Sequence, residues 1–333
     1  PYSHPLAGYI NSVRSITLAD VKAFHSRHFT QNNLVNAIGG SYSKTSLLRL
    51  RKDCKKLPVA QSQKVAAPRP KMPKGLEIII VEKESPSTSI SGAYPISITR
   101  KDKDFMALFL ANSWLGEHRN SFSHLYQEIR AKRGLNYGDY TYVEAFPDGG
   151  RHEFPPLNIG RRQQLFELWI RSVKSENAIF ALRAALCEID RLARTGLTEE
   201  QFLKTQKFLS KYCNHYAKTT LQRLAYKLDD KFYGLSHSHL DTFAKRIRAL
   251  TRSEVNAAIK RHLQSKNMKI VLVTGDGEKL ARQLQSKKKT PITYLTEKTE
   301  EILRKDKLFA EFPLPISSIK RIKSGDLFLG QSK

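Results

Sequence analysis

An internal repeat constrains the fold of this chain more than any other feature of its 333 residues. Residues 16–33 and 250–267 align without a gap at an offset of 234 positions. A repeat at about one domain length indicates two homologous units rather than a short-period solenoid. The identical positions are Thr17, Val21, Ala23, Arg27, His28 and Asn33, which match Thr251, Val255, Ala257, Arg261, His262 and Asn267.

Both copies of the repeat predict the same local structure. Thr17 and Thr251 each stand three residues before an acidic side chain, which is the pattern of a helix capping box. Apolar residues then recur at helical spacing, and a short apolar strand is predicted over residues 34–38 and again over residues 268–273. A helix–strand unit that occurs twice therefore predicts two related domains.

The position of the repeat predicts how the chain is divided. A stretch rich in Pro, Lys and Ala at residues 64–74 is predicted to be a linker. We expect residues 1–63 to be the C-terminal remainder of the first domain, whose start the offset places ~160 residues upstream of Pro1. Residues 75–295 would form a complete second domain and residues 296–333 a C-terminal tail that lies across its surface.

The second domain is predicted to be α+β, because its strands and helices do not alternate as in a parallel βαβ array. A capping box at Thr198 and Gln201 predicts a long helix that runs towards Leu228, and Gly196 is placed to end the helix before it. Other helices are expected over residues 105–115, 122–132 and 178–194, and strands over residues 76–81, 87–98, 135–146 and 165–173.

The charge of the chain narrows the choice of partners. Lys and Arg number 57 against 31 Asp and Glu, a formal net charge of +26. Nucleic-acid-binding proteins usually gather positive charge on one face, whereas this excess is spread along the whole sequence, which argues against nucleic acid as the partner. An acidic peptide or an acidic membrane surface would attract the same charge. The longest apolar stretch, residues 105–115, falls short of the ~18 residues of a membrane span, so none is predicted.

Ten histidines call for a search for a metal site. Neither HExxH nor HxxEH is present. The pair of His237 and His239 is predicted to lie on a solvated loop, and Glu117–His118 and His152–Glu153 are isolated pairs with no third ligand nearby in the sequence. We therefore predict no metal ligands and no catalytic residue in this chain.

One pair of side chains remains as a candidate site. Arg130 lies near the end of a predicted helix, and Tyr137 enters the strand that follows a bend at Gly134. A guanidinium and a phenol fixed at such a junction can both donate hydrogen bonds to a carbonyl or carboxylate. An exposed arginine beside a half-buried tyrosine without a role is the alternative, and the residues alone leave both open.

Four segments of the sequence resemble the M16 metallopeptidases, the family of pitrilysin, insulin-degrading enzyme and mitochondrial processing peptidase. Residues 1–8, PYSHPLAG, and the helix–strand unit at residues 17–40 are similar to segments of that family's first domain. Residues 125–137, LYQEIRAKRGLNY, resemble its R…GLxY segment, and residues 224–234, LAYKLDDKFYG, resemble another recurring stretch. The resemblance covers nearly the whole chain.

This resemblance implies an α+β fold of the LuxS/MPP-like metallohydrolase type, built from paired homologous domains. In the family the first domain carries an HxxEH zinc motif, and the second is catalytically silent and closes over the substrate. The family's substrate-binding Arg and Tyr match Arg130 and Tyr137. The zinc ligands and the glutamate base have no counterpart here, so the chain is expected to be inactive alone, with zinc in the complete enzyme or in a partner.

Two functional hypotheses follow from the resemblance. The chain is either the substrate-binding C-terminal part of a zinc metallopeptidase that cleaves peptides or unfolded proteins, or a non-catalytic subunit or scaffold that pairs with a separate zinc-bearing chain. A basic binder of nucleic acid or of an envelope surface is a third interpretation. The expected compartment is the periplasm or cell envelope of a bacterium, with the mitochondrial matrix as the alternative.

Overall fold

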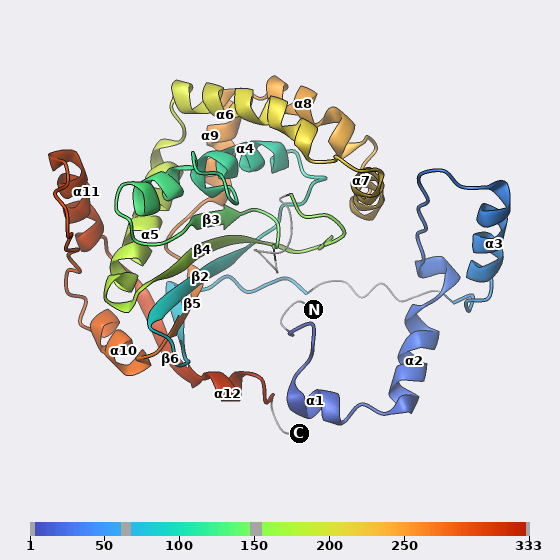
Figure 1. Cartoon of the computed structure of the whole chain (residues 1–333), viewed down its shortest axis with the longest axis horizontal. Coiled ribbons are helices and arrows are strands. Elements are labelled where there is room, and N and C mark those ends of the chain that lie inside the picture. Colours follow the sequence, from blue (N-terminus) through green and yellow to red (C-terminus); the bar gives the residue numbers. More distant parts are fainter. Residues whose placement is uncertain (1–3, 61–67, 147–154, 331–333) are drawn as a thin grey trace.

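A six-stranded mixed sheet forms the centre of the computed structural model, which describes residues 4–60, 68–146 and 155–330 (Figure 1). The strand order is β3-β4-β2-β5-β1-β6. β5 is a central strand, parallel to β1 on one side and antiparallel to β2 on the other. The bounds are β1 Leu76–Glu82, β2 Ser87–Ile96, β3 Asp139–Tyr142, β4 Gln164–Lys174, β5 Met268–Thr274 and β6 Ile316–Lys323.

Helices cover one face of this sheet (Figure 1). Side chains along β2, β4 and β5 alternate between buried and more exposed positions, as expected for strands whose two faces differ in environment. One continuous apolar core lies between the sheet and the helical layer. The main helices of this layer are α4 Phe105–Gly116, α5 Ala178–Thr195, α6 Glu199–Tyr212, α7 Thr220–Tyr233, α8 His239–Ala249 and α9 Arg252–His262.

The predicted helix signals are confirmed at α5 and at the start of α6. Gly196 ends α5 with a φ of 68°, a conformation that glycine adopts at little cost. The Thr198 side chain caps α6 by accepting from the Gln201 N–H, and Gln201 Oε1 in turn accepts a hydrogen bond from the Thr198 N–H. The predicted extent of that helix is wrong, since α6 stops at Tyr212 and a second capping box at Thr219 starts α7.

The segment before β3 differs from the prediction. The helix expected over residues 122–132 is a π-helix over Tyr126–Ala131, and the strand expected over residues 135–146 contracts to β3. The Asn136 amide donates to Asp139 Oδ1 at 2.7 Å and accepts a hydrogen bond from the Gly138 N–H, which folds residues 135–138 into a bend. Side-chain bonding to the local backbone has therefore displaced the expected strand.

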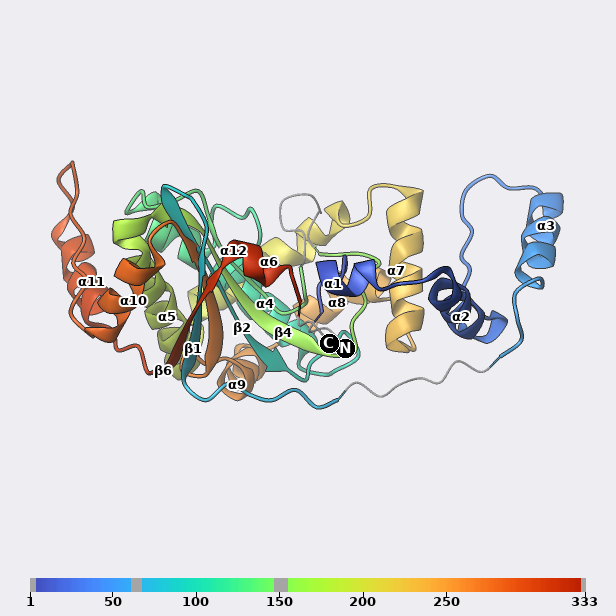
Figure 2. The ribbon, with the colours of Figure 1, turned by 90° about the horizontal axis from the view of Figure 1, so that it is seen from below.

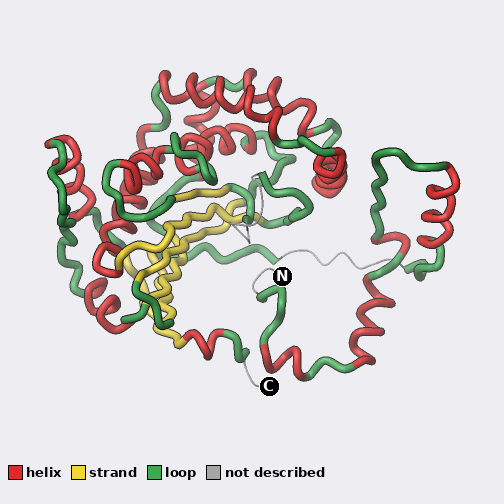
Figure 3. The backbone as a smooth tube through the Cα atoms, viewed as in Figure 1, coloured by secondary structure: helices red, strands yellow, loops and turns green. Residues whose placement is uncertain are grey.

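The N-terminal segment contains helices and loops but no strand in its described part (Figure 3). Its α2 and α3 lie away from the sheet in both views of the ribbon (Figures 1 and 2). The strand predicted over residues 34–38 does not form, whereas its repeat counterpart is β5. A strand needs neighbours for its backbone hydrogen bonds, and the described residues provide no strand paired with this segment. The elements are α1 Ile10–Arg14, α2 Leu18–His28, η1 Gln31–Asn33 and α3 Lys44–Cys54.

The two copies of the repeat differ sharply in burial. Four apolar side chains of the first copy, which we call the apolar N-terminal face, are exposed, and all four counterparts in the second copy are buried. The first-copy helix therefore carries the same apolar side that packs into the core in the second copy, but here that side is exposed. The face consists of Val21, Phe24, Phe29 and Leu34, with counterparts Val255, Ala258, Leu263 and Met268.

The C-terminal tail is more than the surface covering that was predicted. Its helix α11 packs on α5, and β6 then joins the sheet as an edge strand parallel to β1. None of the helices in the described ranges is long and apolar enough to cross a bilayer. The remaining elements are η3 Ser175–Asn177, η4 Cys213–His215, α10 Gly277–Gln285, α11 Glu300–Glu311 and α12 Ser324–Leu327.

Candidate functional site

Arg130 is carried by the π-helix η2, Tyr126–Ala131, which lies between α4 and β3. The Lys132 N–H donates to the Gln127 carbonyl at 3.0 Å, which is the wide spacing of a π turn. Gly134, with a φ of 67°, then closes the turn by donating from its N–H to the Arg130 carbonyl at 2.7 Å. π turns are rare and often occur at functional sites, so this geometry directs attention to Arg130.

The structure brings the two predicted site residues together. The Arg130 guanidinium carbon lies 5.5 Å from the centre of the Tyr137 ring and 4.8 Å from that of Tyr126. The guanidinium also donates a hydrogen bond to the Tyr126 hydroxyl. Stacking of this kind orients an arginine while leaving other donors available. Tyr137 itself is 80% exposed, so its phenol is open to a ligand.

Two further residues shape this site and were missed from the sequence. Tyr126 stands one helical turn before Arg130, and its i,i+4 spacing was the available signal. Asp139 is buried within electrostatic range of Arg130, and burial raises the pKa of its carboxyl to about 8, against the lowering effects of Asn136 and Arg130. The carboxyl is therefore mostly protonated at neutral pH and does not neutralise Arg130.

The arrangement suits recognition of an oxygen acceptor. In the part of the chain that the structure describes, Arg130 forms no ion pair with a carboxylate, and its polar partner is the Tyr126 hydroxyl. The Arg130 guanidinium can donate further hydrogen bonds, and the exposed Tyr137 phenol lies next to it. Together they can bind a peptide carbonyl or a carboxylate. Both groups are hydrogen-bond donors, so the pair is suited to binding an oxygen acceptor.

The two histidines of the pair His237 and His239 lie in different environments. His239 is buried against Phe105, Tyr226 and Phe243, so the predicted solvated loop is wrong for this residue, although His237 is exposed. Burial lowers the pKa of the His239 imidazole.

The side chains of the pair Glu117 and His118 are also buried. The His118 Nδ1 lies 2.9 Å from the Tyr142 hydroxyl, and burial raises the pKa of Glu117 to about 7. His152–Glu153 falls outside the described residues. Across residues 4–60, 68–146 and 155–330, no cluster of three or more His, Cys, Asp or Glu could hold a metal ion.

Comparison with known proteins identifies the family to which this chain belongs. The family model described as the peptidase M16 inactive domain matches residues 15–209. Because the match spans more than half of the sequence, the chain belongs to the peptidase M16 family, as a member of its inactive-domain type. The predicted family and fold class are thereby confirmed.

Several relatives are named as zinc proteases. The chain is 24% identical to an uncharacterized zinc protease of Mycobacterium tuberculosis over 306 residues, which is 86% of this chain and 62% of that protein. It is also 24% identical to an uncharacterized zinc protease of Streptomyces coelicolor over 59% of this chain and 40% of that protein. The chain thus spans only part of the length of these relatives.

Solved structures share the fold. The peptidase M16 inactive domain from Pseudomonas fluorescens matches with a TM-score of 0.68 and 26% identity, covering 82% of this chain and 61% of that one. The periplasmic protease PqqL from Escherichia coli matches with a TM-score of 0.59 and 13% identity over 93% of this chain and 32% of that one. At that identity the second match supports the fold alone.

Proposed function

We propose that this chain supplies the substrate-binding, non-catalytic part of an M16 zinc metallopeptidase. The observation that carries the proposal is the exposed Tyr137 beside Arg130, whose charge no ionised carboxylate neutralises in the described structure. Arg130 and Tyr137 would donate hydrogen bonds to the main-chain carbonyls of a bound peptide or unfolded protein. A main-chain contact of this kind holds a substrate without reading its side chains.

The zinc of the complete enzyme would lie outside this chain. The described residues contain no group that fits a metal ion, so we assign zinc to the zinc-bearing part of the same polypeptide or to a partner subunit. Zinc in such a site supplies an activated water as nucleophile. The residues of this chain would hold and orient the substrate relative to that water.

The apolar N-terminal face supports pairing with such a zinc-bearing part. In the second copy of the repeat the helix α9 buries its apolar side, and β5 lies between two strands. By analogy, the first copy would bury the same side, and residues 34–38 would form a strand, once the rest of a homologous domain is supplied. Exposed apolar side chains that lie together, as Phe24 and Phe29 do, are typical of a surface that a partner covers.

The proposal is tested by peptide turnover in the complete protein. We expect Arg130→Ala to lower kcat/KM by about 10- to 100-fold, since loss of a hydrogen bond from a charged donor costs about 1.5–3 kcal/mol. Tyr137→Phe, which removes only the hydroxyl, should have a smaller effect. Zinc content should stay unchanged in both variants.

The matched control is Arg248→Ala, which removes an exposed arginine from the outer helix α8. Wild-type turnover is expected for this control. Wild-type turnover in Arg130→Ala itself, with zinc present, would show that the Arg130–Tyr137 pair does not hold the substrate.

A further inference from the structure

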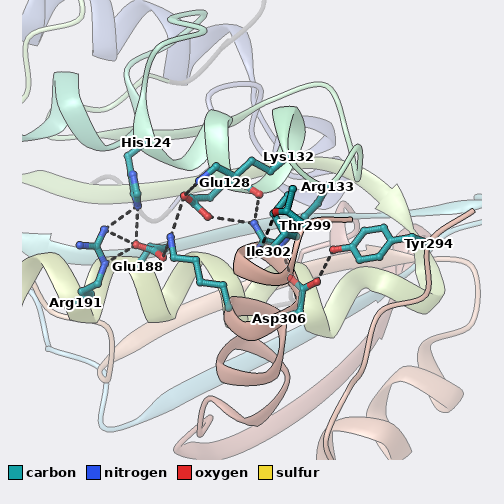
Figure 4. A network of polar contacts seen from close by, with 11 residues as sticks. His124, Glu128, Lys132, Arg133, Glu188, Arg191, Tyr294, Thr299, Ile302 and Asp306 are labelled. Atoms are coloured by element: carbon teal, nitrogen blue, oxygen red, sulfur yellow. Dashed lines mark hydrogen bonds and ion pairs between the residues drawn. The ribbon is translucent and has the colours of Figure 1, made fainter. Parts of the chain in front are cut away.

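A network of polar and charged side chains, centred on two buried glutamates, includes residues of the π turn that carries Arg130 (Figure 4). It joins three elements that are far apart in the sequence, namely η2, α5 and the tail helix α11. We call it the anchoring network. Its members are His124, Glu128, Lys132, Arg133, Glu188, Arg191, Tyr294, Lys305 and Asp306.

The first centre of the network is Glu128, inside the π turn. Its carboxylate is buried and accepts hydrogen bonds from Lys132 at 2.7 Å, Lys305 at 2.9 Å and Arg133 at 3.2 Å. Burial alone would raise the pKa of this carboxyl, but the hydrogen bonds from Lys132 and Lys305 outweigh it and lower the pKa to about 2. Glu128 is therefore charged at neutral pH and fully paired.

The second centre is Glu188, on α5. Its carboxylate lies 3.1 Å from Lys305 Nζ and 2.6 Å from both His124 Nε2 and Arg191 Nη2. Lys305 thus links the two buried glutamates, Glu128 in the π turn and Glu188 in α5. Each carboxylate also has partners of its own, so removal of Lys305 would break the link between the two glutamates and weaken the pairing of both.

The third contact ties α11 to the residue that follows the turn. Asp306 accepts a hydrogen bond from Arg133 Nε at 2.7 Å and another from the Tyr294 hydroxyl at 2.8 Å. The same Arg133 donates from Nη1 to the Glu128 backbone carbonyl at 2.5 Å. Arg133 therefore connects the tail helix to the backbone of the π turn itself.

These contacts explain how a rare turn persists at this position. A π turn contains one residue more than an α turn, and one residue corresponds to about 100° around a helix axis. Reversion to α-helix would move Arg130 around that axis and away from its position between Tyr126 and Tyr137. The anchoring network holds the Glu128 side chain and its carbonyl in the wide geometry.

We propose that α11 of the tail is a positioning element for the candidate site, in which Lys305 and Asp306 hold the π turn so that Arg130 faces Tyr137. The proposal rests on the proposed function, because it treats the Arg130–Tyr137 pair as the substrate contact. It gives the tail, which the sequence predicted only to lie across a surface, a role in substrate positioning. Lys305 and Asp306 act through Arg133 and Glu128 and do not touch the substrate.

The test compares four variants of the complete protein. Lys305→Met removes the link between the glutamates, Lys305→Arg keeps it, Asp306→Asn weakens the Arg133 contact, and Lys307→Met is a matched control at an exposed position of the same helix. The readouts are amide hydrogen exchange over residues 126–137 and the separate values of kcat and KM for a peptide. Zinc content and the unfolding transition are measured alongside.

We expect Lys305→Met and Asp306→Asn to speed exchange over residues 126–137 and to lower kcat/KM by about tenfold. Lys305→Arg should restore both, and Lys307→Met should change neither. If Lys305→Met also lowers the melting temperature of the whole domain, Tyr294→Phe decides, because it removes only one hydroxyl bond to Asp306 and should still speed local exchange.

Two results would refute the proposal in distinguishable ways. Unchanged exchange and turnover in Lys305→Met and Tyr294→Phe, while Arg130→Ala is impaired, would overturn the positioning role and leave the proposed function standing. Faster exchange with unchanged turnover, together with wild-type turnover in Arg130→Ala, would overturn the substrate-binding role on which the proposal rests.

Discussion

Replacement of Phe29 by alanine should cost this chain far less stability than replacement of Leu263, its counterpart in the repeat. Leu263 is 6% exposed in the core, so Leu263→Ala should lower the free energy of unfolding by about 2–5 kcal/mol. Phe29 is 55% exposed, so less than half of its side chain is buried, and Phe29→Ala should cost about 1 kcal/mol. The same substitution should cost about 3–5 kcal/mol in the complete protein, where we expect the ring to be buried.

Urea-induced unfolding, followed by circular dichroism, measures these differences in both contexts. The matched control is Phe122→Ala, which removes an 86% exposed ring from the segment between α4 and η2 and should change stability by less than about 0.5 kcal/mol in either context. A large cost of Phe29→Ala in this chain alone would mean that the apolar N-terminal face is already packed. A cost below about 1 kcal/mol in the complete protein would mean that no partner covers it.

Two predictions concern pH. Because burial raises the pKa of Asp139 to about 8, the folded state holds this proton more tightly than the unfolded state, and stability should fall as pH rises from about 4 to 8, by up to about 1.4 kcal/mol per unit. Asp139→Asn should flatten that slope in thermal unfolding, and an unaltered slope would contradict the assignment. The pKa of Glu128 is lowered to about 2, so its contribution should be present above about pH 4.5 and lost as pH falls towards 2. Glu128→Gln should remove that loss of stability. If the stability of this variant still falls with pH as in the wild type, the ion pairing assigned to Glu128 is refuted.

Local signals in the sequence were sufficient for some elements of the fold. The capping box at Thr251, the apolar face of α9 and the β-branched run of β5 all predict what forms, because the second copy of the repeat has its neighbours present. Residues 34–38 carry a similar signal and form no strand. The difference lies in the partners of the strand, which local sequence does not reveal.

The edge strand β6 shows a second limit. Its apolar residues Ile316, Ile319 and Ile322 recur every third position, which resembles a helix more than the alternation of a strand. A bulge at the start of its pairing with β1 and the parallel ladder to that strand fix it in the sheet instead. Tertiary pairing has overridden the local period.

The candidate site was predictable in part. The sequence placed Arg130 and Tyr137 on either side of a bend at Gly134, and the structure brings their side chains together. The π turn could not be predicted, because its Glu128 pairs with Lys305, which lies far along the chain and also contacts Glu188. Charged residues of this kind are expected on the surface, and only the folded structure shows that Glu188 is buried and that Lys305, itself partly exposed, is paired with it.

The most direct test of the central claim is to locate bound substrate by photo-crosslinking in the complete protein. A benzophenone amino acid at position 137 should crosslink to a labelled peptide, and excess unlabelled peptide should compete. The same group in place of Leu203, an exposed residue of the outer helix α6, should give no specific crosslink. Absence of a crosslink at position 137 while the peptide is being cleaved, or equal crosslinking at both positions, would contradict a substrate-binding role for this chain.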